Sequence, residues 1–165
     1  MNDYKNLNLV KLTENDIDVL IPIMTDAFNK DAEIHLGKDV KFGPPGYDNG
    51  EFLRKWGLAE DSESYKIYYN DKIIGACILW INENKENFLG TIFIEPEYES
   101  KGIGTVVWKL IENKYPDTKK WSTETPGFSR RNHNFYVNKC GFKIIKIDSP
   151  YDFLEASYLM EKEMK

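Results

Sequence analysis

Apolar and polar positions along the chain predict a protein built from both strands and helices. An apolar run at residues 7–12 predicts a first strand, and Thr13 followed by Asp16 is typical of a capping box at a helix start. Pro22 lies inside this helix and is expected to kink or break it. The apolar face of the helix repeats at helical spacing and consists of Ile17, Leu20, Ile21, Met24 and Phe28.

The stretch that follows, residues 29–50, is rich in glycine and proline and is predicted to be a long loop. Long ordered loops in compact domains are often functional. A short helix is expected next, over residues 51–58.

The remaining pattern predicts a sheet. Two runs rich in β-branched and aromatic residues, 64–69 and 72–81, predict a hairpin with its turn at Asn70 and Asp71. Strands that first form a meander and then alternate with helices indicate a mixed α/β sheet, antiparallel at first and then βαβ-like. At 165 residues the chain is most simply one domain, residues 1–165. Further strands are expected at 88–95, 120–125, 142–147 and 156–160, and helices at 102–114 and 129–138.

Composition and charge exclude several classes of protein. Hydrophobic residues make up 41% of the chain, yet the longest apolar runs, 19–24 and 73–81, are too short to span a bilayer. The N-terminus carries no secretory signal, so we expect a cytoplasmic protein without a membrane partner. A net charge of −5 disfavours a nucleic-acid partner. Cys77 and Cys140 have no metal-ligand spacing to a histidine, so we expect reduced buried thiols and no metal.

The acidic charge is concentrated in the first half of the chain. Residues 1–80 carry 14 acidic and 9 basic side chains, whereas residues 81–165 carry 13 of each. An acidic half favours a cationic substrate through its summed field. A solvated surface that keeps the protein soluble explains the same pattern.

Residues 99–105, ESKGIGT, stand between a predicted strand and a predicted helix. Gly102 and Gly104 let the backbone approach an anion, and the N–H groups and dipole of the following helix favour negative charge there. Thr105 adds a hydroxyl and Lys101 a positive charge. An ordinary turn with a packing glycine fits equally well. A Walker loop would end in Gly-Lys-Ser/Thr and a dinucleotide fold would have a third glycine, so both are disfavoured.

Two segments in order resemble signature motifs of the GNAT superfamily of N-acetyltransferases. Residues 89–105, LGTIFIEPEYESKGIGT, resemble the segment with the pattern Gln/Arg-x-x-Gly-x-Gly/Ala after the fourth strand. Residues 131–142, RNHNFYVNKCGF, resemble the later Phe-Tyr-x-Lys-x-Gly-Phe motif. The order of predicted elements also matches the family over nearly the whole chain. The resemblance implies a GNAT-like acyl-CoA N-acyltransferase fold with a βαβ-type cofactor-binding half and acetyl-CoA as co-substrate.

The resemblance also implies roles for individual residues. Backbone groups at residues 92–94 would pair with the pantetheine arm, and one of their N–H groups would meet the developing oxyanion. Tyr136 aligns with the tyrosine that protonates the leaving thiolate in many members, although a packed helix aromatic is the alternative. The residues implied in cofactor binding are Ile92, Phe93, Ile94, Glu99, Ser100, Lys101, Gly102, Ile103, Gly104, Thr105, Asn132, Phe135 and Lys139.

The chain departs from the family pattern at three places. Glu99 replaces the usual Gln or Arg, which is expected to weaken cofactor binding without abolishing it, because main-chain N–H groups provide most of the contacts. Ser129 replaces the usual helix asparagine, and Asn132 is nearby but at a different position. One extra residue separates Tyr136 from Lys139, which leaves the aim of the phenol open.

The implied reaction is direct attack of a neutral amine on the thioester, which requires a base. Glu124, near the end of the predicted strand 120–125, is the first candidate and Glu95 the second, although both fit ordinary strand-end charges. The acceptor pocket is expected within residues 31–56. Its notable side chains are His35, Tyr47, Asp48 and Trp56.

The sequence thus predicts transfer of an acetyl group from acetyl-CoA to a primary amine of a small molecule. Acetylation of a protein N-terminus or lysine is the alternative within the same class. A non-catalytic acetyl-CoA-binding or sensing module is the alternative outside it. The expected partner is a small-molecule amine that the sequence does not identify further, and neither a nucleic acid nor a membrane is expected. The protein is expected to be a monomer or a homodimer.

Overall fold

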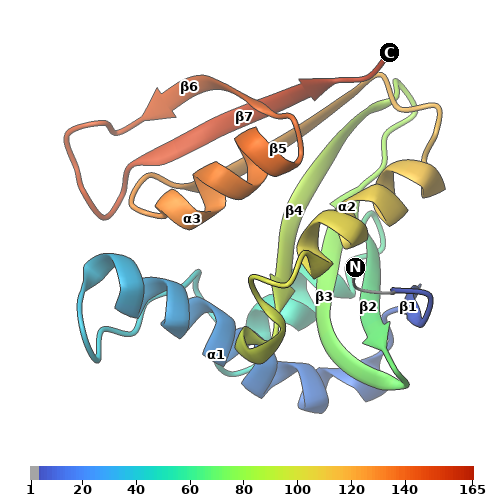
Figure 1. The fold of residues 1–165 in the computed structure, drawn as a ribbon, viewed down its shortest axis with the longest axis horizontal. Coiled ribbons are helices and arrows are strands. Elements are labelled where there is room, and N and C mark those ends of the chain that lie inside the picture. The colour runs from blue at the N-terminus through green and yellow to red at the C-terminus, as the bar shows by residue number, and fades with distance from the viewer. Residues whose placement is uncertain (1–3) are drawn as a thin grey trace.

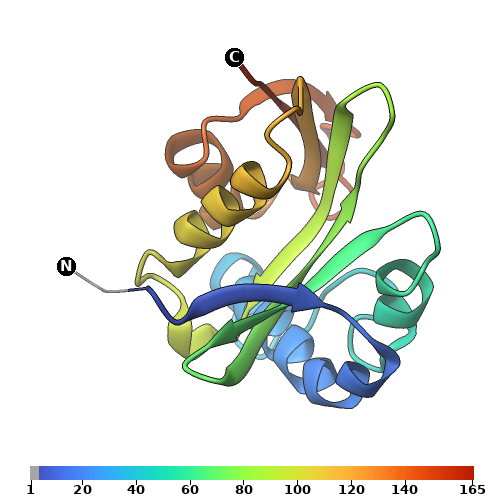
Figure 2. The same ribbon diagram turned by 90° about the vertical axis from the view of Figure 1, so that its right-hand side faces the viewer.

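The computed structural model describes residues 4–165, which form a seven-stranded sheet with helices on both faces (Figures 1 and 2). The strand order is β1-β2-β3-β4-β5-β7-β6, with β4 and β5 parallel and all other neighbours antiparallel, which confirms the predicted mixed sheet. None of the described helices is both long and apolar enough to span a membrane. The strands are β1 Leu7–Lys11, β2 Glu63–Tyr69, β3 Lys72–Trp80, β4 Glu86–Ile94, β5 Lys120–Pro126, β6 Lys143–Asp148 and β7 Ser157–Glu163, and the helices are α1 Ile17–Leu36, α2 Ile103–Lys114 and α3 Arg130–His133.

Each face of the sheet carries its own hydrophobic core. Residues in strands alternate between the two faces, so Ala76 and Ile78 of β3 pack on the side of α1, whereas Cys77 and Leu79 pack on the side of α2. The predicted hairpin of β2 and β3 is confirmed, and its two turn residues have φ of 52° and 63°. Asn and Asp tolerate this left-handed geometry, which suits a two-residue hairpin turn.

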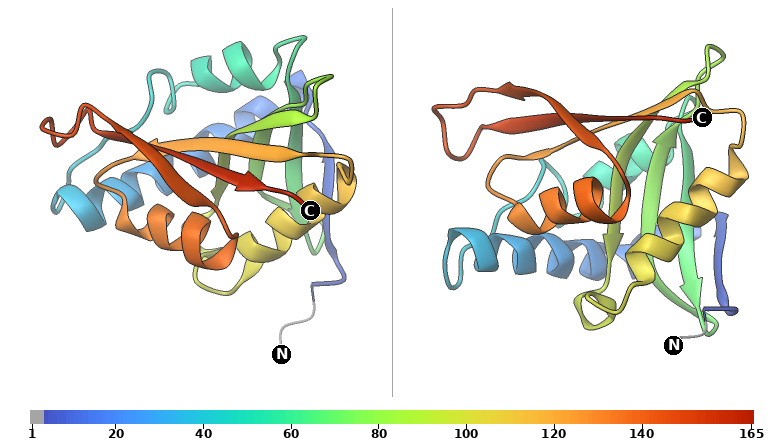
Figure 3. Two further views of the ribbon diagram at one scale, coloured as in Figure 1. Left: turned by 90° about the horizontal axis from the view of Figure 1, so that it is seen from above. Right: turned by 45° about the horizontal axis from the view of Figure 1, so that its top comes forward.

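The sheet splits between β4 and β5. The two strands pair over residues 86–89 and 120–123, and beyond these positions they diverge (Figure 3). Gly90 is an extra residue on β4, because the register with β3 steps from Leu89 to Thr91 there. A bulge bends its strand and increases the local twist. Since this bulge directly follows the last pair with β5, it turns β4 away and opens a V in the sheet.

Helix α1 is longer than the sequence predicts. It continues past Pro22 to Leu36, so the expected break at Pro22 and the expected loop start at residue 29 are wrong. The donor that Pro22 lacks would have paired with the carbonyl of Asp18, which is an exposed residue. The predicted capping box is present, with the Thr13 N–H donating to the Asp16 carboxylate at 2.8 Å.

The chain after α3 is π-helical, over Asn134–Lys139. The N–H of Cys140 donates to the carbonyl of Phe135, five residues earlier. A π-turn holds one more residue than an α-turn. It therefore accommodates the extra residue between Tyr136 and Lys139, and the predicted helix continues through the motif.

Candidate cofactor site

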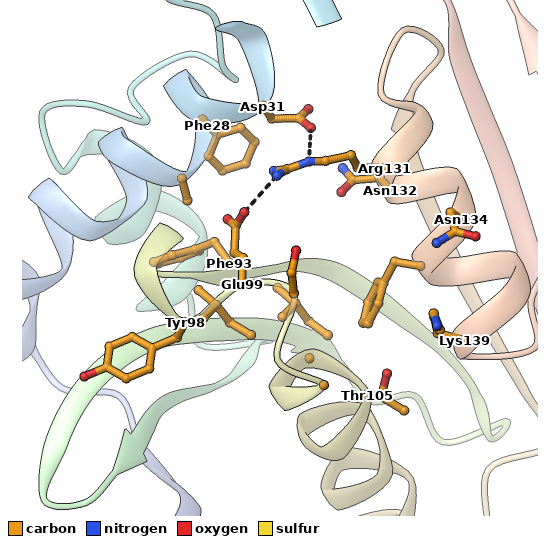
Figure 4. Close-up of a pocket in the computed structure, with 17 residues that line it drawn as sticks. Phe28, Asp31, Phe93, Tyr98, Glu99, Thr105, Arg131, Asn132, Asn134 and Lys139 are labelled. Carbon is orange, nitrogen blue, oxygen red and sulfur yellow. Dashed lines mark ion pairs between the residues drawn. The ribbon is translucent and has the colours of Figure 1, made fainter. Parts of the chain in front are cut away.

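A cavity of about 510 Å³ lies beside the end of β4 that diverges from β5 (Figure 4). Its walls come from α1, β4, the loop that leads into α2, and the α3 region, which is α3 together with the π-helical segment that follows it. The structure brings together most of the residues predicted for cofactor binding. Those that line the cavity are Ile92, Phe93, Ile94, Glu99, Ser100, Gly102, Gly104, Thr105, Asn132, Phe135 and Lys139.

Two predicted cofactor residues lie outside the cavity lining. The side chain of Ile103 is buried in the core under α2. The ammonium of Lys101 lies 5.9 Å from the ring centre of Tyr98, and its backbone carbonyl accepts a hydrogen bond from the hydroxyl of Tyr4. Lys101 therefore contributes to the shape of the loop.

The loop before α2 has the shape that an anion site requires. Gly102 is the N-cap residue of α2. Its φ of 82° is a left-handed conformation that glycine adopts without steric cost. A Cβ on Gly104 would lie 3.0 Å from the ring of Phe135. Glycine at this position therefore lets the start of α2 and the Phe135 ring lie close together. Gly104 and Thr105 belong to the first turn of α2, where N–H groups lack intrahelical acceptors. These residues fit a pyrophosphate at the positive end of the helix dipole.

A chain of three charged side chains crosses the cavity from α1 to the loop before α2. Arg131 Nη1 lies 2.9 Å from a carboxylate oxygen of Glu99, and its Nε lies 3.4 Å from Asp31 (Figure 4). Burial raises the pKa of Glu99, and the charge of Arg131 opposes that effect. The carboxylate at the position where the family pattern has Gln or Arg is thus paired with a cation from α3.

His35 belongs to this network and not to a loop. It lies in the last turns of α1, where its Nε2 is 3.4 Å from both the backbone nitrogen of Arg131 and the carboxylate of Asp31. Burial lowers the pKa of His35, and Asp31 opposes the effect. Ser129 donates to Asp31 at 3.0 Å and accepts from the N–H of Asn132, so it caps α3 and ties it to α1.

Tyr136 lies behind the cavity wall and is not among the lining residues. It is 6% exposed, and its ring packs against Phe142 with 5.7 Å between ring centres. Its hydroxyl lies against the side chain of Thr123, the last β5 residue paired with β4. Burial raises the pKa of Tyr136, so the phenol stays protonated at physiological pH. The hydroxyl is therefore at the apex of the V, on the core side.

The two predicted bases lie outside the cofactor cavity. Glu124 is exposed on β5 and accepts a hydrogen bond from the hydroxyl of Ser157 at 2.5 Å. It points to the opposite face of β5 from Thr123. Glu95 lines a neighbouring hollow of about 480 Å³ and pairs with Lys72 at 3.1 Å.

The structure does not gather the predicted acceptor residues into one pocket. The hydroxyl of Tyr47 donates to Asn29 at 2.6 Å, which ties the loop to α1. Trp56 is 39% exposed and packs edge-on against Trp80. His35 contacts α3, Tyr47 contacts α1, and Trp56 contacts Trp80 of β3, so the three side chains do not form one pocket.

Several cavity residues were missed from the sequence. Arg131 lies four residues before Phe135, so a helical repeat through the motif points to it. Phe28 is predicted on the apolar face of the first helix and Asp31 at the start of the acceptor segment, and neither is predicted to line the cofactor cavity as it does. Tyr98 and Asn134 also line the cavity, and no sequence pattern distinguished them.

Comparison with known proteins places the chain in a family. The sequence model described as acetyltransferase (GNAT) family matches residues 24–142. The uncharacterized protein YrkN of Bacillus subtilis (strain 168) is 41% identical over 116 residues, which make up 70% of this chain. The chain spans 62% of the length of that relative.

Solved structures show the same fold at low sequence identity. An acetyltransferase from Thermus thermophilus has a TM-score of 0.76 at 13% identity, over 98% of this chain and 99% of its own. PaiA N-acetyltransferase from Thermoplasma acidophilum, solved with coenzyme A, has a TM-score of 0.74 at 17% identity, over 96% of this chain and 99% of its own. These similarities confirm the predicted fold, and the match over residues 24–142 shows that the chain belongs to the acetyltransferase (GNAT) family.

Proposed function

We propose that the protein is an N-acetyltransferase that moves an acetyl group from acetyl-CoA to a primary amine. The observation that carries this proposal is that one cavity joins the diverging edge of β4, residues 92–94, to the N-terminus of α2. An extended arm containing amides can pair with a strand edge while its pyrophosphate meets a helix N-terminus. Coenzyme A has both parts, because its amide-containing pantetheine arm is joined directly to a pyrophosphate.

The residues of the chain divide the work of the proposed reaction. Bound acetyl-CoA supplies an acetyl group activated as a thioester. Backbone N–H groups at residues 92–94 orient it and face the oxygen that gains negative charge. Tyr136 is the proposed proton donor, because its buried phenol stays protonated at the apex of the V. Glu124 is the proposed base on the opposite face of β5, with Glu95 as the second candidate.

The proposed acceptor is a small amine that carries positive charge. The net charge of −5 in residues 1–80 supports it, because that half borders the cavity through α1. A spermidine N-acetyltransferase from Vibrio cholerae shares the fold, which is consistent with a small amine. A ribosomal-protein-S18-alanine N-acetyltransferase from Escherichia coli shares it too, so a protein N-terminus is the alternative acceptor. A third candidate is a module that binds acetyl-CoA without turnover, and the carboxylate of Glu99 in the cavity, where the family pattern has Gln or Arg, favours it.

Thiol release from acetyl-CoA tests the proposal with polyamines, simple primary amines and a peptide with a free N-terminus as acceptors. We expect release with a small amine, and Tyr136→Phe should reduce kcat at least about 100-fold while the Kd for CoA stays within about twofold. Thr123→Val is the matched control, since it alters the same contact and keeps the phenol. CoA binding without release from any acceptor would favour the sensing module, and failure to bind CoA would contradict the proposal.

A further inference from the structure

The cofactor cavity is lined by two carboxylates, one on α1 and one at the start of the loop that leads into α2. Asp31 and Glu99 line it, and their side chains are 14% and 23% exposed. Unpaired carboxylates there would repel an anionic ligand, and their burial strengthens that repulsion because water screens them less. A site for coenzyme A in this chain therefore needs a cation that offsets both.

Arg131 is placed to be that cation. It lines the cavity between the two carboxylates, with Nη1 at 2.9 Å from Glu99 and Nε at 3.4 Å from Asp31. A guanidinium has five N–H donors in a rigid planar fork, so two carboxylate contacts leave donors for a phosphate. The side chain is 36% exposed, which leaves it accessible to a ligand in the cavity.

The position of Arg131 is fixed by its neighbours. Asp31 also accepts the hydroxyl of Ser129 at 3.0 Å, and the backbone N–H of Arg131 donates to His35. These contacts come from both α1 and α3, so the guanidinium is held from two sides before any ligand arrives. A pre-positioned group loses less conformational entropy when it binds.

We propose that Arg131 binds the pyrophosphate of the cofactor, and that Glu99 and Asp31 are positioning residues that aim its guanidinium into the cavity. The positive or neutral side chain that the family pattern has at position 99 is replaced here by a cation from α3. This inference rests on the proposed function, because it requires that the cavity binds acetyl-CoA.

Calorimetric titration with CoA tests the role of Arg131. Arg131→Gln should raise the Kd for CoA about tenfold or more, the loss expected for charge-assisted hydrogen bonds. Arg130→Gln is the matched control, because Arg130 is the preceding residue on the same helix, is exposed and does not line the cavity. The control should change the Kd less than about twofold.

A phosphate-free ligand separates binding from structure. Acetylpantetheine lacks the pyrophosphate, so Arg131→Gln should leave its Kd unchanged, whereas a distorted cavity would weaken both ligands equally. Arg131→Lys keeps the charge without the planar fork and should fall between wild type and Arg131→Gln. If Arg131→Gln fails to fold, the lysine variant gives the same comparison of the two ligands.

The carboxylate of Glu99 provides an independent test of the pairing with Arg131. In Arg131→Gln, Glu99 faces the pyrophosphate unpaired, so adding Glu99→Gln should lower the Kd for CoA by several-fold relative to Arg131→Gln alone. Wild-type protein that does not bind CoA would contradict the proposed function. Wild-type binding with equal effects of Arg131→Gln and Arg130→Gln would overturn this inference and leave the proposed function intact.

Discussion

The imidazole of His35 couples two elements that are far apart in the sequence. It lies in the last turns of α1 and contacts the backbone nitrogen of Arg131 in α3. Burial lowers its pKa, so the neutral form is favoured in the folded protein and a proton binds more readily to the unfolded chain. Protonation of this one residue therefore opposes the packing of α1 against α3.

The pH dependence of stability should show this effect. The unfolded imidazole titrates near about 6.5, and the folded one titrates lower, so the free energy of unfolding should fall as pH drops from 7 to 5. His35→Gln should flatten this decline, measured by urea denaturation at both pH values. His133→Gln removes the other histidine of the chain as a control, and equal flattening by both variants would argue against the assignment.

Gly102 shows what a single backbone conformation contributes to the loop. Its φ of 82° is costly for any residue with a Cβ, so Gly102→Ala should lower the free energy of unfolding by about 1 kcal/mol. It should also weaken CoA binding, because the first turn of α2 shifts. Ser100→Ala is the control, since Ser100 is exposed and already left-handed at 61°, and it should change stability by less than about 0.5 kcal/mol.

At the scale of elements, local patterns predicted the strands well and the helix contacts poorly. The β2–β3 hairpin followed from alternation and its turn residues, which are local signals. The second half of α1 is polar, as a loop would be, because Asp31 and His35 pair with α3 across the cavity. The helical repeat points to Arg131 as a cavity residue, but its two carboxylate partners are distant in sequence, so no local pattern predicts the ion pairs. The V depends on the bulge at Gly90, and a bulge can be identified only when the pairing of β4 with β3 is known.

Pro22 in α1 leads to a prediction at this scale. The helix is continuous, so Pro22→Ala restores a backbone donor without changing the fold, and it should raise the free energy of unfolding by roughly 1–3 kcal/mol. Urea denaturation measures the change. Val19→Ala, at an exposed position in the same helix, should shift stability by less than about 0.5 kcal/mol. A destabilised Pro22→Ala would mean that the helix depends on the proline.

At the scale of the whole molecule, two halves of the sheet meet at a narrow junction, where four residue pairs join β4 to β5. The core beside α2 contains residues of both halves, including Leu89 of β4 and Trp121 of β5. The cavity occupies the space past this junction and is lined by residues from both halves. A ligand there therefore ties the two halves of the sheet together.

Coenzyme A should accordingly stabilise the entire fold. At a concentration 100 times its Kd it should add about 2.7 kcal/mol to the free energy of unfolding, seen as a rise in Tm. Amide exchange should slow both at residues 92–94 of β4 and in α3, because residues of both segments line the cavity. Acetylpantetheine serves as the control and should protect β4 more than the loop before α2. Protection confined to one half would contradict a bridging ligand.

The divergence of β4 from β5 also affects the protein when no cofactor is bound. Past Leu89, the backbone of β4 on that side is a strand edge inside the molecule. Exposed edges pair with strands of other chains and promote aggregation, and proteins protect them by covering them. Here residues 92–94 of this edge line a cavity whose other walls include α1 and the α3 region. The helices that shape the binding site therefore also cover this edge of β4 when no cofactor is bound.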